Sequence, residues 1–213
     1  MRARNKEIMR NYAFLKESEN WSLCRLKEYQ REQLLRLMDY AQRSPYYREL
    51  YESEGVDFRQ VRDLSDLQRL PTVSKSSLLA NSSRIQLPNY KGKLVRSETS
   101  GSTGQPLVFY RDQQWDGWVN ASVFRGMSWH GVRPWERNGY LWGFNIAGSK
   151  KVRVRIEDEL QNRFRLFSYS KTEMLAFIRR LQGAQFLSGY SSMIYELAKL
   201  ANAEGISLKN LRF

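Results

Sequence analysis

Hydroxyl-bearing residues and glycines are concentrated in one stretch of the chain, which reads Thr99, Ser100, Gly101, Ser102, Thr103, Gly104, Gln105 and Pro106. The residues on either side, 94–98 and 107–110, form short runs that contain β-branched or aromatic side chains, so we predict two strands joined by this loop. Glycine permits close approach of the backbone, and several N–H groups can then converge on one anion while Ser and Thr hydroxyls donate further hydrogen bonds. The residue types therefore predict a phosphate-binding loop, with an ordinary hairpin turn as the alternative. It is not a Walker loop, because no Gly-Lys-Ser/Thr closes it.

Few other residues offer chemistry of their own. The single cysteine, Cys24, excludes an internal disulfide framework and a cysteine-cluster metal site. The single histidine, His130, removes most other metal and triad schemes, and its place before Gly131 at a predicted helix end indicates a structural role. We predict no metal site and assign no catalytic residue. Any reaction must use hydroxyls, backbone groups, Lys or Arg, carboxylates and a bound cofactor.

The order Ser-Gly-Ser-Thr-Gly-x-Pro between two strands resembles the phosphate-binding loop of the adenylate-forming enzymes, which activate a carboxylic acid with ATP as an acyl-adenylate. Residues 44–50, 67–75 and 188–192 resemble segments of the phenylacetate-coenzyme A ligase branch, which includes relatives in capsular polysaccharide biosynthesis. The resemblance runs from about Leu26 to Phe213. It covers nearly the whole chain but only the amino-terminal half of such an enzyme.

The resemblance implies ATP with Mg²⁺ as cofactor, a small carboxylic acid as substrate, and coenzyme A or an amine as acceptor. It places the β- and γ-phosphates against Thr99, Ser100, Gly101, Ser102, Thr103 and Gly104, with Gln105 where many relatives carry lysine. It also implies an acyl pocket near Trp142, Phe144, Gly189 and Tyr190. The family's residues for magnesium, ribose and the late lysine would follow Phe213. We therefore expect a fragment, or one half of a split gene, that forms little or no adenylate by itself.

Helical spacing and capping signals predict helices over 26–44, 45–54, 74–79, 112–130, 172–182 and 193–203. A further short helix is predicted after Asp63 or Ser65, ended by Leu70 and Pro71. In the helix after Asp112, a core-facing stripe is predicted, formed by Trp115, Val119, Val123, Gly126 and Met127. Strands are predicted at 140–144 and 185–188, and a further one begins at Leu208. Residues 107–110 suit a strand covered on both faces. Val152, Val154 and Ile156 alternate with arginines, which predicts a half-buried strand or an exposed basic edge.

These elements predict an α/β protein. A helical amino-terminal layer, 1–90, precedes a portion, 91–213, with a mixed or mostly parallel sheet, flanking helices and right-handed crossovers. Both belong to one incomplete large domain. A helix amino terminus at Ser191 or Ser192, just beyond a strand, is where open α/β sheets bind ligands.

The formal charge of +13 leaves a second class of function open. A basic chain with many aromatic residues can bind nucleic acid or another polyanion, but no run of five or six like charges occurs, which indicates a solvated basic surface. A third alternative is a non-catalytic partner of a split ligase, and a homodimer is a further assembly left open. The sequence carries no apolar run long enough for a bilayer and no secretory segment, so we expect a cytoplasmic protein.

Overall fold

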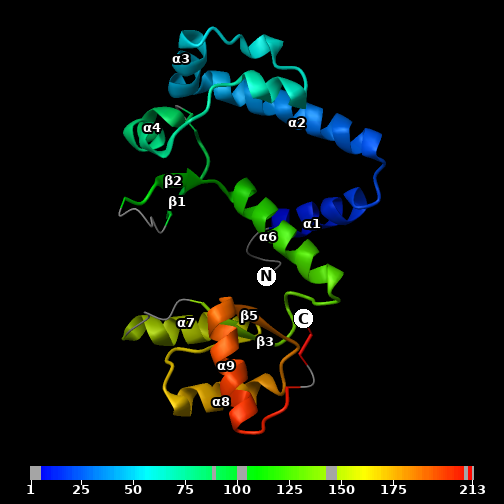
Figure 1. The fold of residues 1–213 in the computed structure, drawn as a ribbon, viewed down its shortest axis with the longest axis vertical. Helices are drawn as coiled ribbons and strands as arrows, with labels where there is room; N and C mark the ends of the chain where they lie inside the picture. The colour runs from blue at the N-terminus through cyan, green and yellow to red at the C-terminus, as the bar shows by residue number, and fades with distance from the viewer. Residues whose placement is uncertain (1–5, 88–89, 100–104, 143–147, 209–210, 213) are drawn as a thin grey trace. The chain divides into compact units, whose positions relative to one another are not determined.

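The structure is a computed structural model that describes the chain except for residues 1–5, 88–89, 100–104, 143–147, 209–210 and 213 (Figure 1). Its described residues form two compact units, an amino-terminal unit of residues up to Ala121 and a carboxyl-terminal unit from Ser122 onward. This boundary falls inside one helix, α6 (Gln113–Trp129). The chain is α/β, as its sequence predicts. The division at residue 90 stays a prediction about the larger domain.

The amino-terminal unit is mostly helical. Its elements are α1 (Lys6–Ser18), α2 (Leu23–Arg43), α3 (Pro45–Ser53), the 3-10 helices η1 (Phe58–Gln60) and η2 (Leu64–Arg69), α4 (Lys75–Ala80), α5 (Ser82–Ile85), and the strands β1 (Val95–Glu98) and β2 (Val108–Arg111). The junction between α2 and α3 lies where proline predicts it, because the residue before proline disfavours α geometry. Ser44 is extended and buried, and its hydroxyl donates a 3.1 Å hydrogen bond to the carbonyl of Arg84.

Two burial predictions in this region are wrong. β2 forms a two-stranded sheet with β1 among the described residues, and Tyr110 is exposed, so this strand is not covered on both faces. Of the stripe predicted to face the core, Trp115, Val119 and Val123 on α6 are exposed, and Gly126 and Met127 are half-buried. Gly117, on another face of the helix, is buried. A Cβ on Gly117 would lie 2.9 Å from the Cβ of Glu7 on α1. Helix α6 therefore meets α1 through a small residue, which a search for large apolar side chains overlooks.

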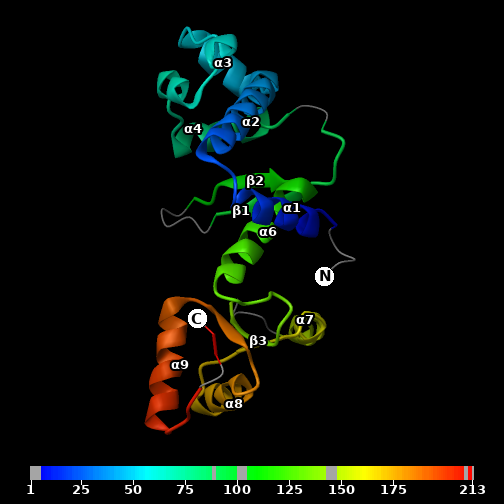
Figure 2. The ribbon, with the colours of Figure 1, turned by 90° about the vertical axis from the view of Figure 1, so that its right-hand side faces the viewer.

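The carboxyl-terminal unit is built on a parallel sheet. Its elements after α6 are β3 (Asn138–Leu141), α7 (Ser149–Leu160), β4 (Arg163–Arg165), α8 (Lys171–Leu181), β5 (Phe186–Gly189) and α9 (Ser191–Ala203). The strand order is β4-β3-β5, and β3 pairs in parallel with both neighbours. Helices α7 and α9 lie on opposite sides of this sheet (Figure 2). The core is formed mainly by Leu141, Ile178, Leu181 and Leu197, which are all but inaccessible to solvent.

Two sequence predictions change in this unit, and one strand was not predicted. Residues 152–156, predicted as a half-buried strand or an exposed basic edge, lie in helix α7, because two parallel strands need a crossover. The alternation of Val and Arg there coincides with helical contacts such as the Arg153–Glu157 pair. The neighbouring strand is β4 instead, with the sequence Arg-Phe-Arg, for which the sequence predicted no element. Of the strand expected from Leu208, the described residues 208, 211 and 212 are not extended in a ladder, although the Arg212 amide donates to the Gln185 carbonyl at 2.8 Å.

Candidate functional site

The stem of the predicted phosphate loop is an antiparallel hairpin. Strand β1 pairs with β2 in a register that sets Glu98 opposite Val108. Beyond this pair the Thr99 amide donates to the Leu107 carbonyl at 3.0 Å, and the Leu107 amide donates to the Thr99 hydroxyl oxygen at 3.1 Å. The two ends of the intervening segment are therefore held together at its base, as a loop between two strands requires.

Of the six residues predicted to bind phosphate, Thr99 is described and Ser100, Gly101, Ser102, Thr103 and Gly104 lie outside the described residues. The Thr99 hydroxyl oxygen already accepts the Leu107 amide. Its hydroxyl hydrogen remains able to donate to a ligand, because a threonine hydroxyl both accepts and donates. Thr99 can thus fix the base of the loop and contribute one donor at its edge.

The predicted acyl-pocket residues lie at the carboxyl edge of the parallel sheet. Leu141, the last residue of β3, pairs with Gly189, the last residue of β5. The next residue on each strand is aromatic, and the rings of Trp142 and Tyr190 lie 4.2 Å apart between centroids, tilted by 48°. Both rings are partly exposed. The structure thus brings together Trp142, Gly189 and Tyr190, whereas Phe144 lies outside the described residues.

Gly189 is required by this packing. A Cβ built on it would lie 2.3 Å from the Cβ of Leu141, far closer than two side-chain carbons can approach. Helix α9 begins immediately beyond, with Tyr190 as its N-cap and Ser191 as its first residue, in agreement with the predicted helix start at a strand end. The Met193 amide donates to the Tyr190 carbonyl at 3.0 Å, so Ser191 and Ser192 form the first turn.

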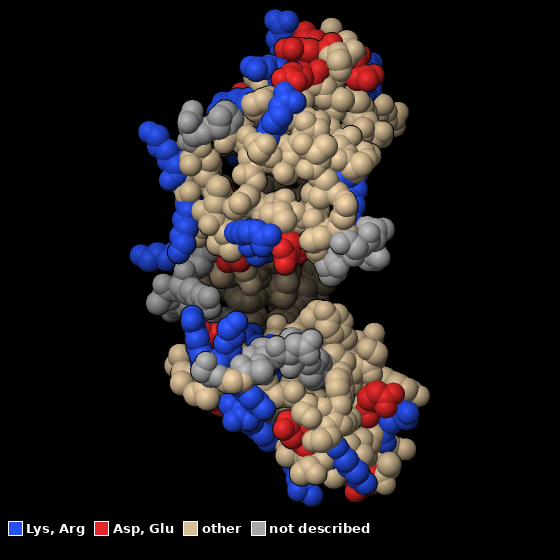
Figure 3. All heavy atoms as spheres, turned by 90° about the vertical axis from the view of Figure 1, so that its left-hand side faces the viewer, with Lys and Arg blue, Asp and Glu red and all other residues tan. Residues whose placement is uncertain are grey.

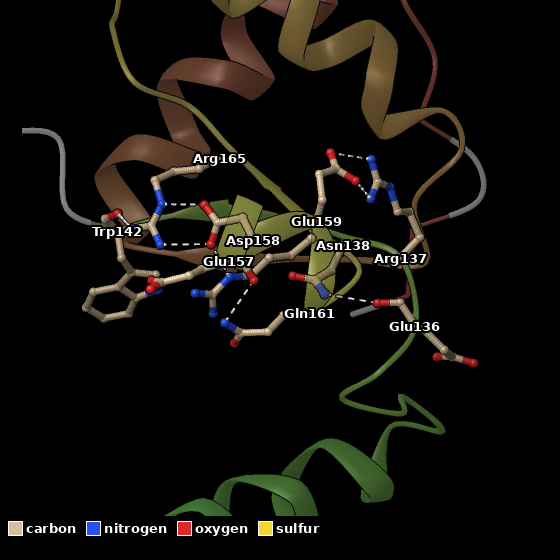
Figure 4. A network of polar contacts seen from close by, with 10 residues as sticks. Glu136, Arg137, Asn138, Trp142, Glu157, Asp158, Glu159, Gln161 and Arg165 are labelled. Carbon is tan, nitrogen blue, oxygen red and sulfur yellow. Dashed lines mark hydrogen bonds and ion pairs between the residues drawn. The ribbon is translucent and has the colours of Figure 1, made fainter. Parts of the chain in front are cut away.

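A buried carboxylate on helix α7, which was not predicted from the sequence, supports this edge through arginines of the neighbouring strand β4. Asp158, near the end of α7, accepts hydrogen bonds from Arg163 Nε at 2.5 Å, from Arg165 Nε at 2.9 Å and from Arg165 Nη2 at 3.1 Å. Arg165 Nη1 in turn donates to the carbonyl oxygen of Trp142 (Figure 4). The guanidinium of Arg165 therefore connects a fixed negative charge to the backbone of a predicted pocket residue.

Charge pairing dominates the ionisation of this carboxylate. Burial pushes the pKa of Asp158 upward, but the hydrogen bonds and positive charges of Arg165 and Arg163 outweigh it and hold that pKa below its ordinary value. Asp158 is therefore ionised at neutral pH. The guanidinium carbons of Arg163 and Arg165 also lie 4.3 and 4.6 Å from the centre of the Tyr140 ring, which adds cation–π contacts on β3.

A second ion pair stabilises the opposite end of β3. Glu159 accepts from Arg137 Nη1 at 2.7 Å and Nη2 at 3.2 Å (Figure 4). It also accepts from Arg180 Nη2 at 2.9 Å. The hydrogen bonds from Arg137, followed by its charge and by Arg180, hold the pKa of Glu159 below its ordinary value despite some desolvation. Neighbouring acids on one helix thus tie α7 to the two ends of the sheet. The spacing of Asp158 from Arg163 and Arg165 is the only sequence signal for the first of these networks.

An apolar cavity of about 430 Å³ lies beside the hairpin, in the amino-terminal unit. Helices α4 and α5 and the hairpin form its walls, with side chains Leu78, Ser82, Ile85, Gln86, Leu87, Tyr90, Leu94, Leu107, Val108, Phe109 and Tyr110. At its edge the Tyr90 hydroxyl donates to Asp112 at 3.0 Å, and this bond raises the pKa of Tyr90. The sequence gives no signal for this cavity, because its walls meet only after the chain folds back.

Two absences hold for the described part of the chain. No three His, Cys, Asp or Glu side chains among the described residues lie close enough together to hold a metal ion. In the same residues no helix combines the length and the apolar character needed to cross a membrane.

Comparison with known proteins identifies several relatives. No protein-family profile matches the chain. It is 36% identical over 134 residues to a phenylacetate-coenzyme A ligase of Thermus thermophilus, and the aligned residues cover 58% of this chain and 29% of that protein. It is 30% identical over 104 residues to a phenylacetate-coenzyme A ligase of Escherichia coli, and the aligned residues cover 48% of this chain and 24% of that protein. Protein CapK of Staphylococcus aureus is 24% identical over 172 residues, covering 78% and 38%.

The fold is also similar to solved structures. A crystal structure of 2-hydroxyisobutyryl-CoA ligase with 2-HIB-AMP and CoA in the thioesterification state matches with a TM-score of 0.66 and 21% identity, over 89% of this chain and 43% of that one. An open conformation of the same ligase matches with a TM-score of 0.63 and 20% identity, over 87% and 42%. At this identity the likeness establishes the fold. The chain spans less than half the length of each of these relatives.

Proposed function

Because the chain is a relative of the phenylacetate-coenzyme A ligase branch of the adenylate-forming superfamily, we propose that it forms the phosphate-binding part of an ATP-dependent, AMP-forming carboxylic acid ligase. Such an enzyme joins the acid to AMP with release of pyrophosphate and then transfers the acyl group to coenzyme A or an amine. The observation that supports this proposal is the hairpin whose base is closed by Thr99 and Leu107 around the Ser/Gly/Thr stretch.

The loop residues would act on the phosphates electrostatically. The hydroxyls of Ser100, Ser102 and Thr103 and the amides of Gly101 and Gly104 are donors suited to the β- and γ-phosphates, whose charge grows as pyrophosphate leaves. Mg²⁺ would neutralise phosphate charge when bound, but the described residues offer no cluster of acids for it, and we derive no step from it.

The carboxyl edge of the parallel sheet would receive the acid. Trp142 and Tyr190 present partly exposed aromatic surface there, and Gly189 allows β5 to lie close against Leu141 beneath the two rings. Arg165, fixed by Asp158, donates to the carbonyl of Trp142 and so fixes the backbone at this residue. In this proposal Arg165 and Asp158 are positioning residues, since neither needs to touch the substrate.

ATP binding to the 213-residue chain, measured by isothermal titration calorimetry, tests the loop. Removing one donor to phosphate costs about 1.5–3 kcal/mol, so Thr103→Ala should weaken binding about 10- to 100-fold. Gly104→Ala should do the same by blocking backbone approach. The matched control is Thr172→Ala, an exposed threonine on α8, which should bind like the unaltered chain. ATP affinity unchanged in both loop variants would refute the phosphate site.

We further propose that these 213 residues alone do not complete adenylate formation, since the matching ligases are more than twice as long. Pyrophosphate exchange that depends on ATP and a carboxylic acid should remain at background with the chain alone. Robust exchange would contradict this second statement while leaving the phosphate site intact, so the two assays separate the two claims.

The net charge of +13 supports a second candidate, a polyanion-binding module. Figure 3 shows Lys and Arg spread over the viewed face with Asp and Glu among them, without one continuous basic patch. Several arginines are also paired with carboxylates, such as Arg137 with Glu159 and Arg163 with Asp158. Binding to single-stranded and duplex oligonucleotides at two salt concentrations tests this candidate, because contact with several phosphates gives a steep salt dependence.

A further inference from the structure

Helix α7 carries an apolar stripe on its outer face. Val152, Ile156 and Leu160 are four residues apart, so they line one side of the helix, and they are 60%, 58% and 81% exposed. The opposite side carries Asp158, whose carboxylate is buried against β4. Three aligned aliphatic side chains facing outward on one short helix mark a surface that associates with another surface.

The charges beside this stripe are arranged in a regular order. At 100° per residue, Arg153 and Glu157 flank the stripe on one side, and Arg155 and Glu159 flank it on the other. In each flank the basic residue precedes the acidic one by four positions. This order is the less favourable one for an isolated helix, because cations lie toward the positive amino end and anions toward the negative carboxyl end. The charge order therefore suits an intermolecular contact better than the helix itself.

We propose that two copies of this chain associate through α7 as an antiparallel pair, with Ile156 at a two-fold axis. A two-fold axis in the plane of the interface reverses the direction of the helix and keeps each flank on its own side. Val152 then lies opposite the partner's Leu160, and Arg153 lies beside the partner's Glu157. The apolar stripe covers itself, and each charge meets its opposite.

The same charges disfavour a parallel pair. In a parallel pair the two-fold axis runs along the helices, and the flank of Arg153 and Glu157 meets the partner's flank of Arg155 and Glu159 at the same height. Arg153 would then approach the partner's Arg155, and Glu157 would approach the partner's Glu159. Like charges at those positions repel, whereas the antiparallel arrangement also aligns the two helix dipoles favourably. The sequence of α7 thus selects one orientation.

Contacts already present within the chain decide which flank gives specificity. Arg153 Nε lies 2.9 Å from Glu157, and the two side chains are 82% and 46% exposed, so both can turn to a partner copy. Glu159 on the other flank is already paired with Arg137 and Arg180. The flank of Arg153 and Glu157 therefore carries the specific charge contact.

The contact is small. Three apolar side chains from each copy cover less than the roughly 800 Å² per partner of a standard interface, so we expect a dimer that dissociates on dilution. Sedimentation velocity of the full 213-residue chain over a concentration series should show a shift from the 25.2 kDa monomer toward twice that mass. A chain that stays monomeric up to millimolar concentration would overturn the proposal.

Variants test the interface itself. Ile156→Glu sets two carboxylates at the axis and should raise the dimer dissociation constant at least about tenfold. The matched control is Leu37→Glu on α2, where the leucine is similarly exposed at 57%, and it should leave the constant unchanged. Equal dissociation constants for the unaltered chain and Ile156→Glu would place any dimer elsewhere and refute the α7 interface.

Charge reversal tests the orientation and does not depend on how well the first variant folds. Arg153→Glu should raise the dissociation constant about three- to fivefold, since it opposes the partner's Glu157. Adding Glu157→Arg should restore the original value, because the reversed pair is again complementary across the axis and within the helix. A double variant as weak as the single one would contradict the antiparallel register. Circular dichroism should show equal helix content in all variants.

Discussion

Replacing Asp158 by asparagine removes the one negative charge that Arg163 and Arg165 share. The Asp158 side chain is 3% exposed and that of Arg165 is 9% exposed, so the positive charge left behind has little access to water. Removing one partner of a buried pair costs about 3–5 kcal/mol. We expect the lower end, about 3 kcal/mol, because the amide oxygen keeps one acceptor and Arg163 is partly exposed.

Urea unfolding followed by circular dichroism and tryptophan fluorescence measures this cost. With a denaturant slope of about 2 kcal/mol per molar, Asp158→Asn should lower the unfolding midpoint by about 1.5 M. Trp129, Trp135 and Trp142 lie in the same unit as Asp158, and the chain's other tryptophans lie in the amino-terminal unit, so fluorescence should report the transitions of both units. The loss should appear there first, because the network ties α7 to β4 and to the end of β3.

Asp39→Asn on α2 is the matched control. Asp39 pairs with Arg43 at 2.5 Å, four residues along the helix, but both side chains are about half exposed. Such a surface pair contributes about 0.5 kcal/mol or less. If Asp158→Asn shifts the midpoint no more than Asp39→Asn does, the buried network does not stabilise the sheet and its proposed positioning role is wrong.

Further predictions follow from the glycines and from pH. Gly189→Ala should lower the free energy of unfolding by about 2–3 kcal/mol in thermal unfolding, because its Cβ would collide with the Cβ of Leu141. Gly126→Ala has no atom within 4 Å of the added Cβ and should stabilise α6 by up to about 1 kcal/mol. Equal effects of the two substitutions would contradict this packing. The pKa of Asp158 is lowered in the folded state, so its stabilisation is complete above the ordinary carboxyl pKa and is lost as pH falls through the folded value. Urea midpoints measured from pH 7 to 3 should therefore decline less in Asp158→Asn than in the unaltered chain, and parallel declines would refute the assignment.

Local signals in the sequence predicted most of the helices. Pro45 fixes the junction of α2 and α3 because it acts through its own ring and the preceding residue. The Ser170 cap begins α8, as the serine hydroxyl accepts the Glu173 amide at 3.3 Å. These interactions span at most four residues, so they can be identified without knowing the fold.

Burial was predicted less well, because it depends on which face of an element meets another. On α6 the apolar stripe that includes Trp115 and Val119 is exposed, whereas Gly117 packs on α1. On α7 the alternation of Val and Arg predicted a strand, but the connection between parallel β3 and β4 is a helix. In each case a partner distant in sequence determined the outcome.

In the candidate site, too, local features were predicted from the sequence and long-range contacts were not. Residue types predicted a loop between two strands, since turn chemistry and strand propensity are properties of adjacent residues, and the resemblance to the adenylate-forming enzymes assigned phosphate binding to 99–104. The pairing of Leu141 with Gly189, the contact of Trp142 with Tyr190, and the hold of Arg165 on the Trp142 carbonyl were decided only by the tertiary structure. The physical reason is that these contacts join residues more than 20 positions apart in the chain, and only the register of the parallel strands brings such residues together.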